Sequence, residues 1–196
     1  DWQPAGSRHR VLGRLALARL SRPDFLWTPY RDFVSGLDQN TWSLAVTAVS
    51  AWRPNLTNEA RAGFSRDDLH WDRPHPEIPT LFSGDGTVLP GSPAFYEYRN
   101  RSRSLELADN LLWTSGRHLL KAGAGLLSRR LDGLLSAGRD GLYVFGDILD
   151  FSLDSPGFFS TSLARRSLPD LRQPEFPREY RYRQLFLFAQ ATFNAA

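Results

Sequence analysis

The sequence predicts an all-β protein built as an antiparallel up-and-down meander, and three observations support this fold class. Six segments alternate apolar and polar residues with a period of two, which is the period of a β-strand. Gly, Thr and Trp recur in these segments and the apolar residues do not repeat at helical spacing, so helices compete poorly. The connections between the segments are alternately short and long along the chain.

The second segment shows the clearest alternation. Between residues 40 and 53, one face carries Trp42, Leu44 and Val46, and the opposite face carries small and hydroxyl side chains. In the first segment, Leu15 and Arg14 fall on opposite faces in the same way. The other four segments also alternate, with a less clear separation of apolar from polar residues. The six predicted strands are residues 8–20, 40–53, 57–67, 101–113, 118–130 and 181–193.

The links between these strands fall into two classes. Residues 54–56 and 114–117 are short links of turn-forming residues. Residues 21–39, 70–100 and 131–179 are long links, and loops of this length are uncommon in compact domains unless they have a function. Short turns at one end of a meander and long loops at the other are typical of an outer-membrane β-barrel, with periplasmic turns and extracellular loops. We therefore expect part of such a barrel, located in the outer membrane of a Gram-negative bacterium.

Composition narrows the class of protein further. The chain has 196 residues, of which 41% are apolar and 23% charged, as in an ordinary folded domain. It contains no Cys, which excludes disulfides and thiolate metal sites. A formal net charge of +3, scattered along the chain, does not support a nucleic-acid partner. The chain also contains no Met, and we expect residues 1–196 to be a fragment of one barrel domain.

Tryptophan spacing agrees with a membrane-spanning strand. Trp42 and Trp52 lie ten residues apart on the apolar side of one predicted strand. At about 3.3 Å per residue and a tilt of about 40°, this spacing covers about 25 Å along the membrane normal, the height of the apolar band between two aromatic girdles. Trp113, on the apolar side of the fourth strand, is expected in the same girdles. Asp109 interrupts that side, and we expect a β-bulge or a position near the interface to accommodate it.

Four stretches of this sequence together resemble the barrel of Oar-like TonB-dependent outer-membrane receptors. Each stretch alone describes little more than an amphipathic strand and a turn, but their order and spacing extend the resemblance over most of the chain. The stretches are 33–42 (FVSGLDQNTW), 54–64 (PNLTNEARAGF), 107–113 with 116–123 (LADNLLW and GRHLLKAG) and 182–193 (YRQLFLFAQATF).

The resemblance implies properties that these residues alone do not. It implies a barrel of about 22 strands closed by a plug domain, and uptake energised by the TonB complex through that plug. Neither a plug domain nor a TonB box is recognisable within residues 1–196, so the plug is expected to be absent from this segment.

Two groups of residues are candidate metal ligands. His70, Asp72, His75 and Glu77 place two imidazoles and two carboxylates in one polar loop, but their spacing fits no compact motif. Residues 147, 150 and 154 are Asp at spacings of three and four, which a short helix would stack on one side as a calcium-like cluster. In both cases a solvated loop is the favoured interpretation. We expect no metal, no cofactor, no catalytic residue and no enzymatic activity, because no nucleophile elbow or phosphate-binding loop is present.

Arginines gather at the strand ends that face the long loops. In a barrel this is the outer-leaflet rim, where guanidinium groups hold lipid A phosphates or, if they point inward, steer an anionic solute. Aromatic residues of the loops, namely Phe95, Tyr96, Tyr98, Phe158 and Phe159, are candidates for stacking on a sugar or a siderophore. The rim candidates are Arg99, Arg101, Arg103, Arg129, Arg130, Arg181 and Arg183.

The expected function is energised uptake of an unidentified solute by a barrel of the TonB-dependent class. Its expected partners are outer-membrane lipid and lipopolysaccharide, the TonB complex and a small solute. Two alternatives remain open at this point. One is a soluble β-sandwich that binds carbohydrate, in which a second sheet would cover Leu44 and Val46. The other is a barrel with a surface adhesion or structural role and no transport.

Overall fold

The fold was taken from a computed structural model of residues 1–196. The structure describes residues 1–93, 97–136, 138–164, 169, 172 and 174–193. Phe95 and Tyr96, two of the loop aromatics considered above, lie outside the described residues.

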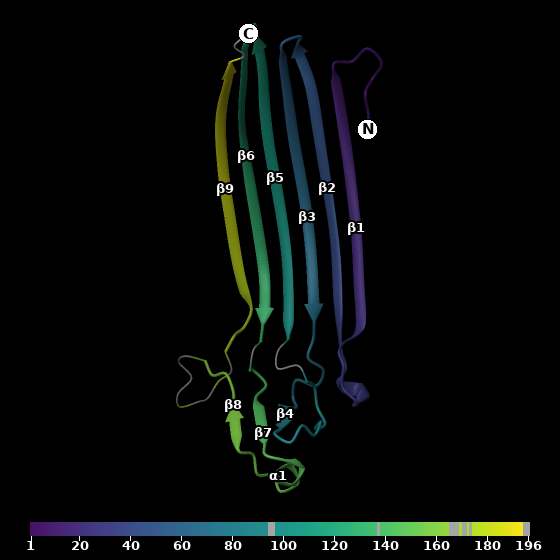
Figure 1. Ribbon diagram of the computed structural model, residues 1–196, viewed down its shortest axis with the longest axis vertical. Helices are drawn as coiled ribbons and strands as arrows, with labels where there is room; N and C mark the ends of the chain where they lie inside the picture. The colour runs from purple at the N-terminus through teal and green to yellow at the C-terminus, as the bar shows by residue number, and fades with distance from the viewer. Residues whose placement is uncertain (94–96, 137, 165–168, 170–171, 173, 194–196) are drawn as a thin grey trace.

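Six long strands form one antiparallel sheet in the order β1-β2-β3-β5-β6-β9 (Figure 1). The predicted meander is confirmed, because each long strand pairs with the long strand that follows it in sequence. The bounds are β1 His9–Leu26, β2 Ser35–Arg53, β3 Leu56–Trp71, β5 Tyr98–Ser115, β6 His118–Leu135 and β9 Arg178–Phe193.

The strands are 16 to 19 residues long, well beyond the about 9–11 that a tilted strand needs to cross a bilayer. All six extend further toward the long loops than the sequence predicted. Near the long loops, charged residues occur on both faces of the strands, so the sequence no longer alternates between apolar and polar residues. Backbone pairing nevertheless continues through them, as in the register pair Asp68 and Arg101.

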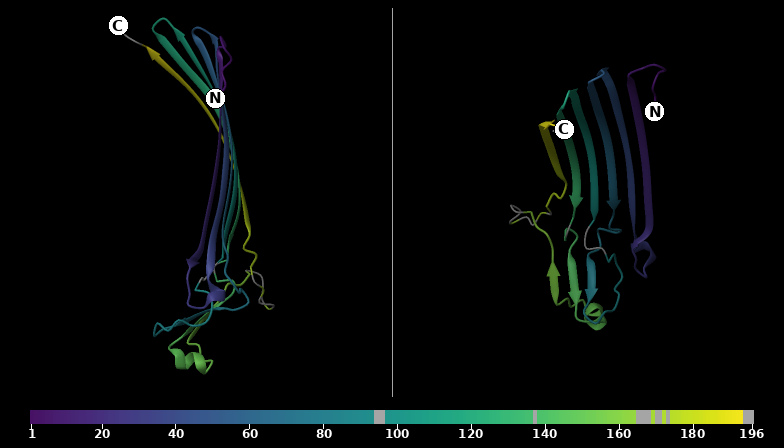
Figure 2. Two further views of the ribbon diagram at one scale, coloured as in Figure 1. Left: turned by 90° about the vertical axis from the view of Figure 1, so that its right-hand side faces the viewer. Right: turned by 45° about the horizontal axis from the view of Figure 1, so that its top comes forward.

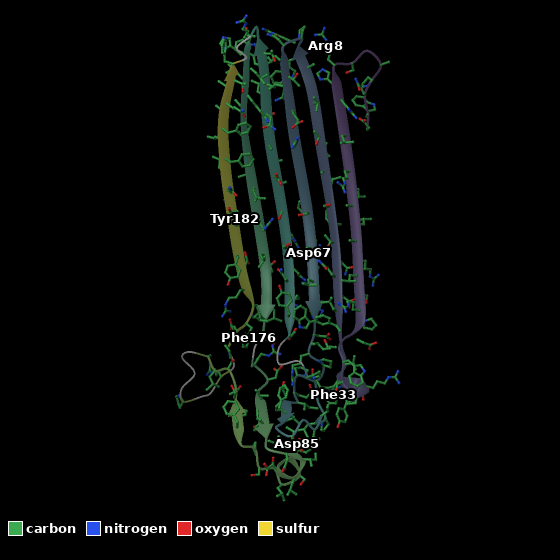
Figure 3. The ribbon with its side chains drawn as sticks, viewed as in Figure 1. Arg8, Phe33, Asp67, Asp85, Phe176 and Tyr182 are labelled. Carbon is green, nitrogen blue, oxygen red and sulfur yellow. The ribbon has the colours of Figure 1, made fainter. Side chains whose placement is uncertain are left out.

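Tight turns join the strands at the opposite end. Gly116 connects β5 to β6 with a φ of +56°, a left-handed conformation that glycine adopts without strain. The sheet is twisted and curved, and it remains open within this chain, with β1 at one edge and β9 at the other (Figure 2). Side chains stand on both sides of it, with Arg8 at the turn end and Asp67 on β3 toward the loops (Figure 3).

A second, smaller sheet forms among the long loops, and the sequence analysis did not anticipate it. Its strands are β4 Thr80–Ser83, β7 Leu142–Phe145 and β8 Phe158–Ser160, with β4 parallel to β7. The 3₁₀ helix η1 Arg31–Phe33 and the helix α1 Ile148–Ser152 complete the described loop elements. Figure 1 shows this sheet beyond the ends of the long strands and not over their faces.

Among the described residues, the buried apolar side chains lie at the loop end: Leu37, Leu89, Leu134 and Phe145. The conventional core of this chain is therefore in and beside the loop assembly. Within the part of the chain that the structure describes, no helix is long and apolar enough to cross a membrane.

Candidate functional site: two faces and a loop assembly

The register gives the large sheet one apolar face. Residues directly opposite each other share a face, and the row Leu15, Leu44, Phe64 and Leu105 crosses four neighbouring strands on the Trp42 side. These side chains are open to the surroundings, with Leu15 62% exposed. The soluble β-sandwich is therefore wrong, because no described residue forms a second layer over Leu44.

Tryptophans mark both ends of this apolar face. Trp113 lies at the turn end, opposite Leu56 on β3. Trp52 lies at the same end, where β2 carries a bulge. Trp42 lies toward the loops, and its ring centroid is 5.0 Å from that of Phe64. By register, the levels of Trp42 and Trp113 differ by ten residues, or about 33 Å of strand.

Asp109 lies inside the apolar face, between Ala60 on β3 and Ala124 on β6. The expected β-bulge is wrong, because the β3–β5 register runs without interruption past this residue. Asn58 accommodates the carboxylate instead, and its Nδ2 donates to Asp109 Oδ1 at 2.6 Å. Small neighbours leave a shallow hollow of about 580 Å³ beside Asp109, whose wall includes Val46.

The opposite face is polar and hydrogen-bonded between strands. Asp67 accepts from the Thr41 hydroxyl and from Gln39 Nε2, the latter at 2.9 Å. Nearer the turns, Glu59 forms an ion pair of 2.6 Å with Arg61 on the same strand. A face with this chemistry suits contact with water, as in the lumen of a barrel.

Two aromatic rings on β9 cover glycines on β6, a feature that the sequence analysis missed. A Cβ on Gly125 would lie 2.0 Å from Phe186 Cζ, and a Cβ on Gly123 would lie 2.5 Å from Phe188 Cε1. The rings therefore lie directly on the glycine backbone of the polar face. Lys121 Nζ is 5.7 Å from the Phe188 ring centroid. Two glycines two residues apart, opposite two phenylalanines at the same spacing, were the signal in the sequence.

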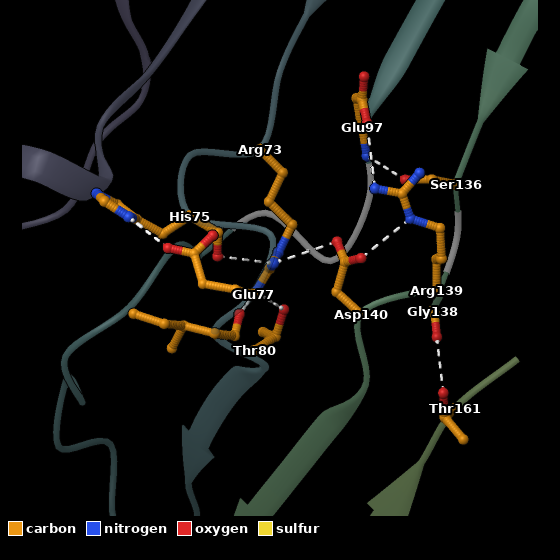
Figure 4. Close-up of polar contacts among 11 residues, drawn as sticks. Arg73, His75, Glu77, Thr80, Glu97, Ser136, Gly138, Arg139, Asp140 and Thr161 are labelled. Atoms are coloured by element: carbon orange, nitrogen blue, oxygen red, sulfur yellow. Dashed lines mark hydrogen bonds and ion pairs between the residues drawn. The ribbon is translucent and has the colours of Figure 1, made fainter. Parts of the chain in front are cut away.

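A buried ion pair joins the loop after β3 to the loop after β6 (Figure 4). Arg73 Nη1 lies 3.2 Å from Asp140 Oδ2, with the side chains 1% and 6% exposed. Arg73 also donates to the carbonyl oxygen of Ile78 at 2.5 Å and to the Thr80 hydroxyl at 3.3 Å. Burial lowers the pKa of the Arg73 guanidinium, and the Asp140 carboxylate opposes that shift. Arg139 donates to the other oxygen of Asp140 at 3.1 Å.

The same assembly contains a pocket of about 370 Å³. Trp27 and Phe82 lie on its wall with residues 86–89. The Tyr30 hydroxyl donates to the carbonyl oxygen of Val88 at 2.9 Å and holds this backbone in place. Partly exposed aromatic rings beside backbone polar groups can bind a small organic ligand.

The residues weighed as metal ligands do not come together. His75 Nδ1 is 2.8 Å from Glu77 Oε1, whereas His70 is part of β3 and pairs with Arg99. Asp72 is not part of the His75–Glu77 pair. Its backbone carbonyl accepts a hydrogen bond from the Ser35 hydroxyl. In the described ranges no group of three His, Asp or Glu side chains is placed to hold a metal ion.

The aspartates that were the candidate calcium-like cluster have local structural contacts instead. Asp147 caps α1 and accepts from the backbone N–H of Asp150 at 2.9 Å. Asp150 in turn accepts from the backbone N–H of Gly146 at 3.2 Å. Asp154 lies outside the helix, so the candidate stack of three carboxylates does not form, in line with the favoured interpretation of a solvated loop.

Two of the three loop aromatics within the described residues, Tyr98 and Phe159, pack on another aromatic ring. Tyr98 belongs to β5, and its ring stacks on Trp71 with centroids 4.3 Å apart. Phe159 lies 4.5 Å from Tyr143, centroid to centroid. Phe158, on β8, remains 56% exposed.

The rim arginines divide between the two faces. Arg129 is on the polar face, where its Nε donates to the Ser104 hydroxyl at 3.0 Å, so the structure places it away from lipid. By register, the other six share the face of Trp42: Arg99, Arg101, Arg103, Arg130, Arg181 and Arg183.

Comparison with known families agrees with this architecture. The comparisons with curated proteins and with solved structures gave no match. The family described as "Outer membrane beta barrel domain" matches residues 1–196, the whole length of the chain. The chain therefore belongs to the outer membrane β-barrel family, and it is an outer-membrane protein with long extracellular loops and short periplasmic turns.

Proposed function

We propose that this chain forms part of the barrel wall of a TonB-dependent receptor that takes up a scarce solute across the outer membrane. The observation that carries the proposal is the polar face, which presents hydrogen-bonded side chains from the level of Glu59 to that of Asp67. A wall of this chemistry serves a water-filled or plug-filled lumen. The sequence resemblance to Oar-like receptors supports the same assignment.

The apolar face supports the membrane placement that the proposal needs. Trp113 and Trp52 would lie in the periplasmic girdle, and Trp42 in the outer one. Their separation of about 33 Å along a strand projects to about 25 Å at a tilt of about 40°, the height of a barrel's apolar band. The long loops would then lie outside the cell, with the Trp27 pocket facing the medium.

Barrel closure requires strands beyond these six. Bacterial transmembrane barrels of a single chain have about eight strands or more, and here β1 and β9 do not pair with each other. A receptor of the resembled class would add further strands, a plug in the lumen and contact with TonB. The proposal assigns no catalytic role to the chain.

Surface adhesion without transport is the second candidate function. It is favoured by the exposed aromatic side chains of the loop assembly, where Trp27 is 68% and Phe158 56% exposed. Exposed aromatic rings suit a surface that binds a polymer or a neighbouring cell as well as they suit a pocket that binds a solute.

Deletion of the gene for the whole protein separates the two candidates. Uptake of a panel of labelled iron chelates and oligosaccharides is measured in the deletion strain and in a strain that lacks TonB. The proposal expects uptake of one solute to fall in both strains and to return when the gene is restored. Unchanged uptake of every solute, together with loss of surface attachment, would favour adhesion.

A further inference from the structure

Four arginines form one row across neighbouring strands. Arg66 on β3 is opposite Arg103 on β5, Arg103 is opposite Arg130 on β6, and Arg130 is opposite Arg181 on β9. The next residue in this row, on β2, is Trp42. The row therefore lies on the apolar, outward face, and like charges directly opposite each other in a sheet are destabilising.

The row lies at the loop-side boundary of the apolar band. One step toward the turns, the same face carries Leu44, Phe64 and Leu105. One step toward the loops, it carries Asp68 and Asp132. On β3 and β5 the arginines thus mark the level at which outward side chains change from hydrocarbon to charge, on the extracellular side, whereas β6 and β9 carry Ser128 and Arg183 one step nearer the turns.

The carboxylates near the row neutralise only part of it. Arg130 Nη2 lies 2.9 Å from Glu179 Oε2, and Arg181 Nε lies 2.7 Å from Glu179 Oε1. Arg66 is 4.0 Å from Asp68. Arg103, between two other arginines, makes no ion pair with a carboxylate of the described residues. On the outward face of β3, β5, β6 and β9, seven arginines stand against four carboxylates, of which Asp109 lies six residues nearer the turns than the row: Arg66, Arg99, Arg101, Arg103, Arg130, Arg181 and Arg183 against Asp68, Asp109, Asp132 and Glu179.

We infer that this arginine row binds the phosphate groups of a phosphorylated glycolipid in the outer leaflet. Guanidinium groups bind phosphate oxygens in pairs, and an anion beside Arg103 would relieve the repulsion along the row. The lipid is favoured over a free anion because the row faces outward, directly above an apolar surface on which acyl chains can lie. Arg129, one residue before Arg130, points to the opposite face and makes no part of the site.

A hollow beside the row gives the rest of the headgroup a place. It has a volume of about 370 Å³ and is lined by Arg99, Arg101 and Arg130, among others. Its position on the loop side of the row matches the direction in which the sugars of a glycolipid leave the membrane. The inference depends on the outer-membrane location of the chain and not on the transport proposal.

The test uses the full-length protein, purified from outer membranes in detergent. Binding of lipid A with its phosphates, of dephosphorylated lipid A and of inorganic phosphate is measured by thermophoresis. The variants are Arg103→Gln with Arg130→Gln together, and Arg129→Gln as the matched control on the opposite face. We expect the double variant to bind phosphorylated lipid A about tenfold or more weakly, as loss of charge-assisted hydrogen bonds predicts. The control variant and the wild type should bind it equally.

Three results would overturn the inference: equal binding by the double variant and the wild type, an equal loss in Arg129→Gln, or inorganic phosphate binding as tightly as phosphorylated lipid A. The last would identify a free-anion site. If the double variant does not reach the outer membrane, Arg103→Lys keeps the charge but loses the two-pronged geometry. It should show a smaller loss for phosphorylated lipid A, and no loss at all would again contradict the site.

Discussion

At Asp109 a single carboxylate sits within a surface that otherwise meets lipid. Its hydrogen bond from Asn58 satisfies part of its acceptor capacity, and Asn58 is itself only 9% exposed. Charged groups on the lipid face of a barrel are costly at depth, although acidic residues cost less than basic ones. We therefore expect the contributions of Asn58 and Asp109 to the free energy of unfolding to be coupled, because each residue satisfies the hydrogen-bonding group of the other.

Replacing Asn58 by Ala should lower the free energy of unfolding by about 1–3 kcal/mol, since it leaves Asp109 without its donor. Replacing both residues by Leu should cost much less than the single change, because no polar group is then left unsatisfied. Urea unfolding of the refolded full-length barrel in lipid vesicles measures both. A loss in the double variant as large as the loss in Asn58→Ala, or larger, would show that the pair is not coupled.

Gly123 and Gly125 allow close packing of the Phe188 and Phe186 rings, and adding a single methyl group tests this role. A methyl group on Gly125 would overlap the Phe186 ring, so Gly125→Ala should lower the free energy of unfolding by about 1–3 kcal/mol. The same change at Gly13, where no atom lies within 4 Å of the added Cβ, is the matched control and should cost little. Equal effects at the two positions would contradict close packing of the ring on the glycine.

The loop residue Asp85 is expected to respond to pH. The Ser83 hydroxyl and the backbone and hydroxyl of Thr87 donate to its carboxylate and lower its pKa from the ordinary 3.8 to about 2. Because the folded pKa is the lower one, the stabilisation of this turn is fully present above about pH 4 and is lost as the pH falls through about 2. Hydrogen exchange of the Thr87 amide should accelerate over that window in the wild type, and Asp85→Asn should remove the pH dependence.

At the scale of elements, the two long loops behave as one folded unit. The buried Arg73–Asp140 pair joins segments that are 67 residues apart, and β4 pairs with β7 across the same two loops. Removing one member of a buried pair leaves the other charge unpaired. The loop assembly should therefore depend on this contact far more than the long strands do.

Replacing Arg73 by Met should destabilise the loop assembly by about 3–5 kcal/mol. Limited proteolysis should then cleave within residues 72–97 and 136–164 while the long strands stay protected. Arg10→Ala is the control, since its ion pair with Asp1 is exposed and worth about 0–1 kcal/mol. Unchanged protection of the loops in Arg73→Met would contradict the role of the pair.

At the scale of the whole molecule, the alternation of side chains was enough to predict the meander and its two faces. That signal is local, because period two places Leu44 and Val46 together wherever the strand pairs. The arginine row and the Arg73–Asp140 pair depend on register and on contacts between distant loops, which no local pattern encodes. The short strands β4, β7 and β8 have too few residues to show a period. The strand ends were missed because charge on both faces ended the apolar pattern before the pairing ended.

The central claim is that the Trp42 face touches lipid and the opposite face touches water. Residues 1–196 contain no Cys. A single Cys is introduced at each position from 105 to 111 of the full-length protein, in a background with no other Cys, and carries a nitroxide label. Collision with oxygen and with a water-soluble nickel complex is then measured in native outer membranes. The labels at 105, 107 and 111 should be reached by oxygen, and those at 106, 108 and 110 by the nickel complex. Equal access along the strand, or an outward face closed to oxygen, would contradict the account.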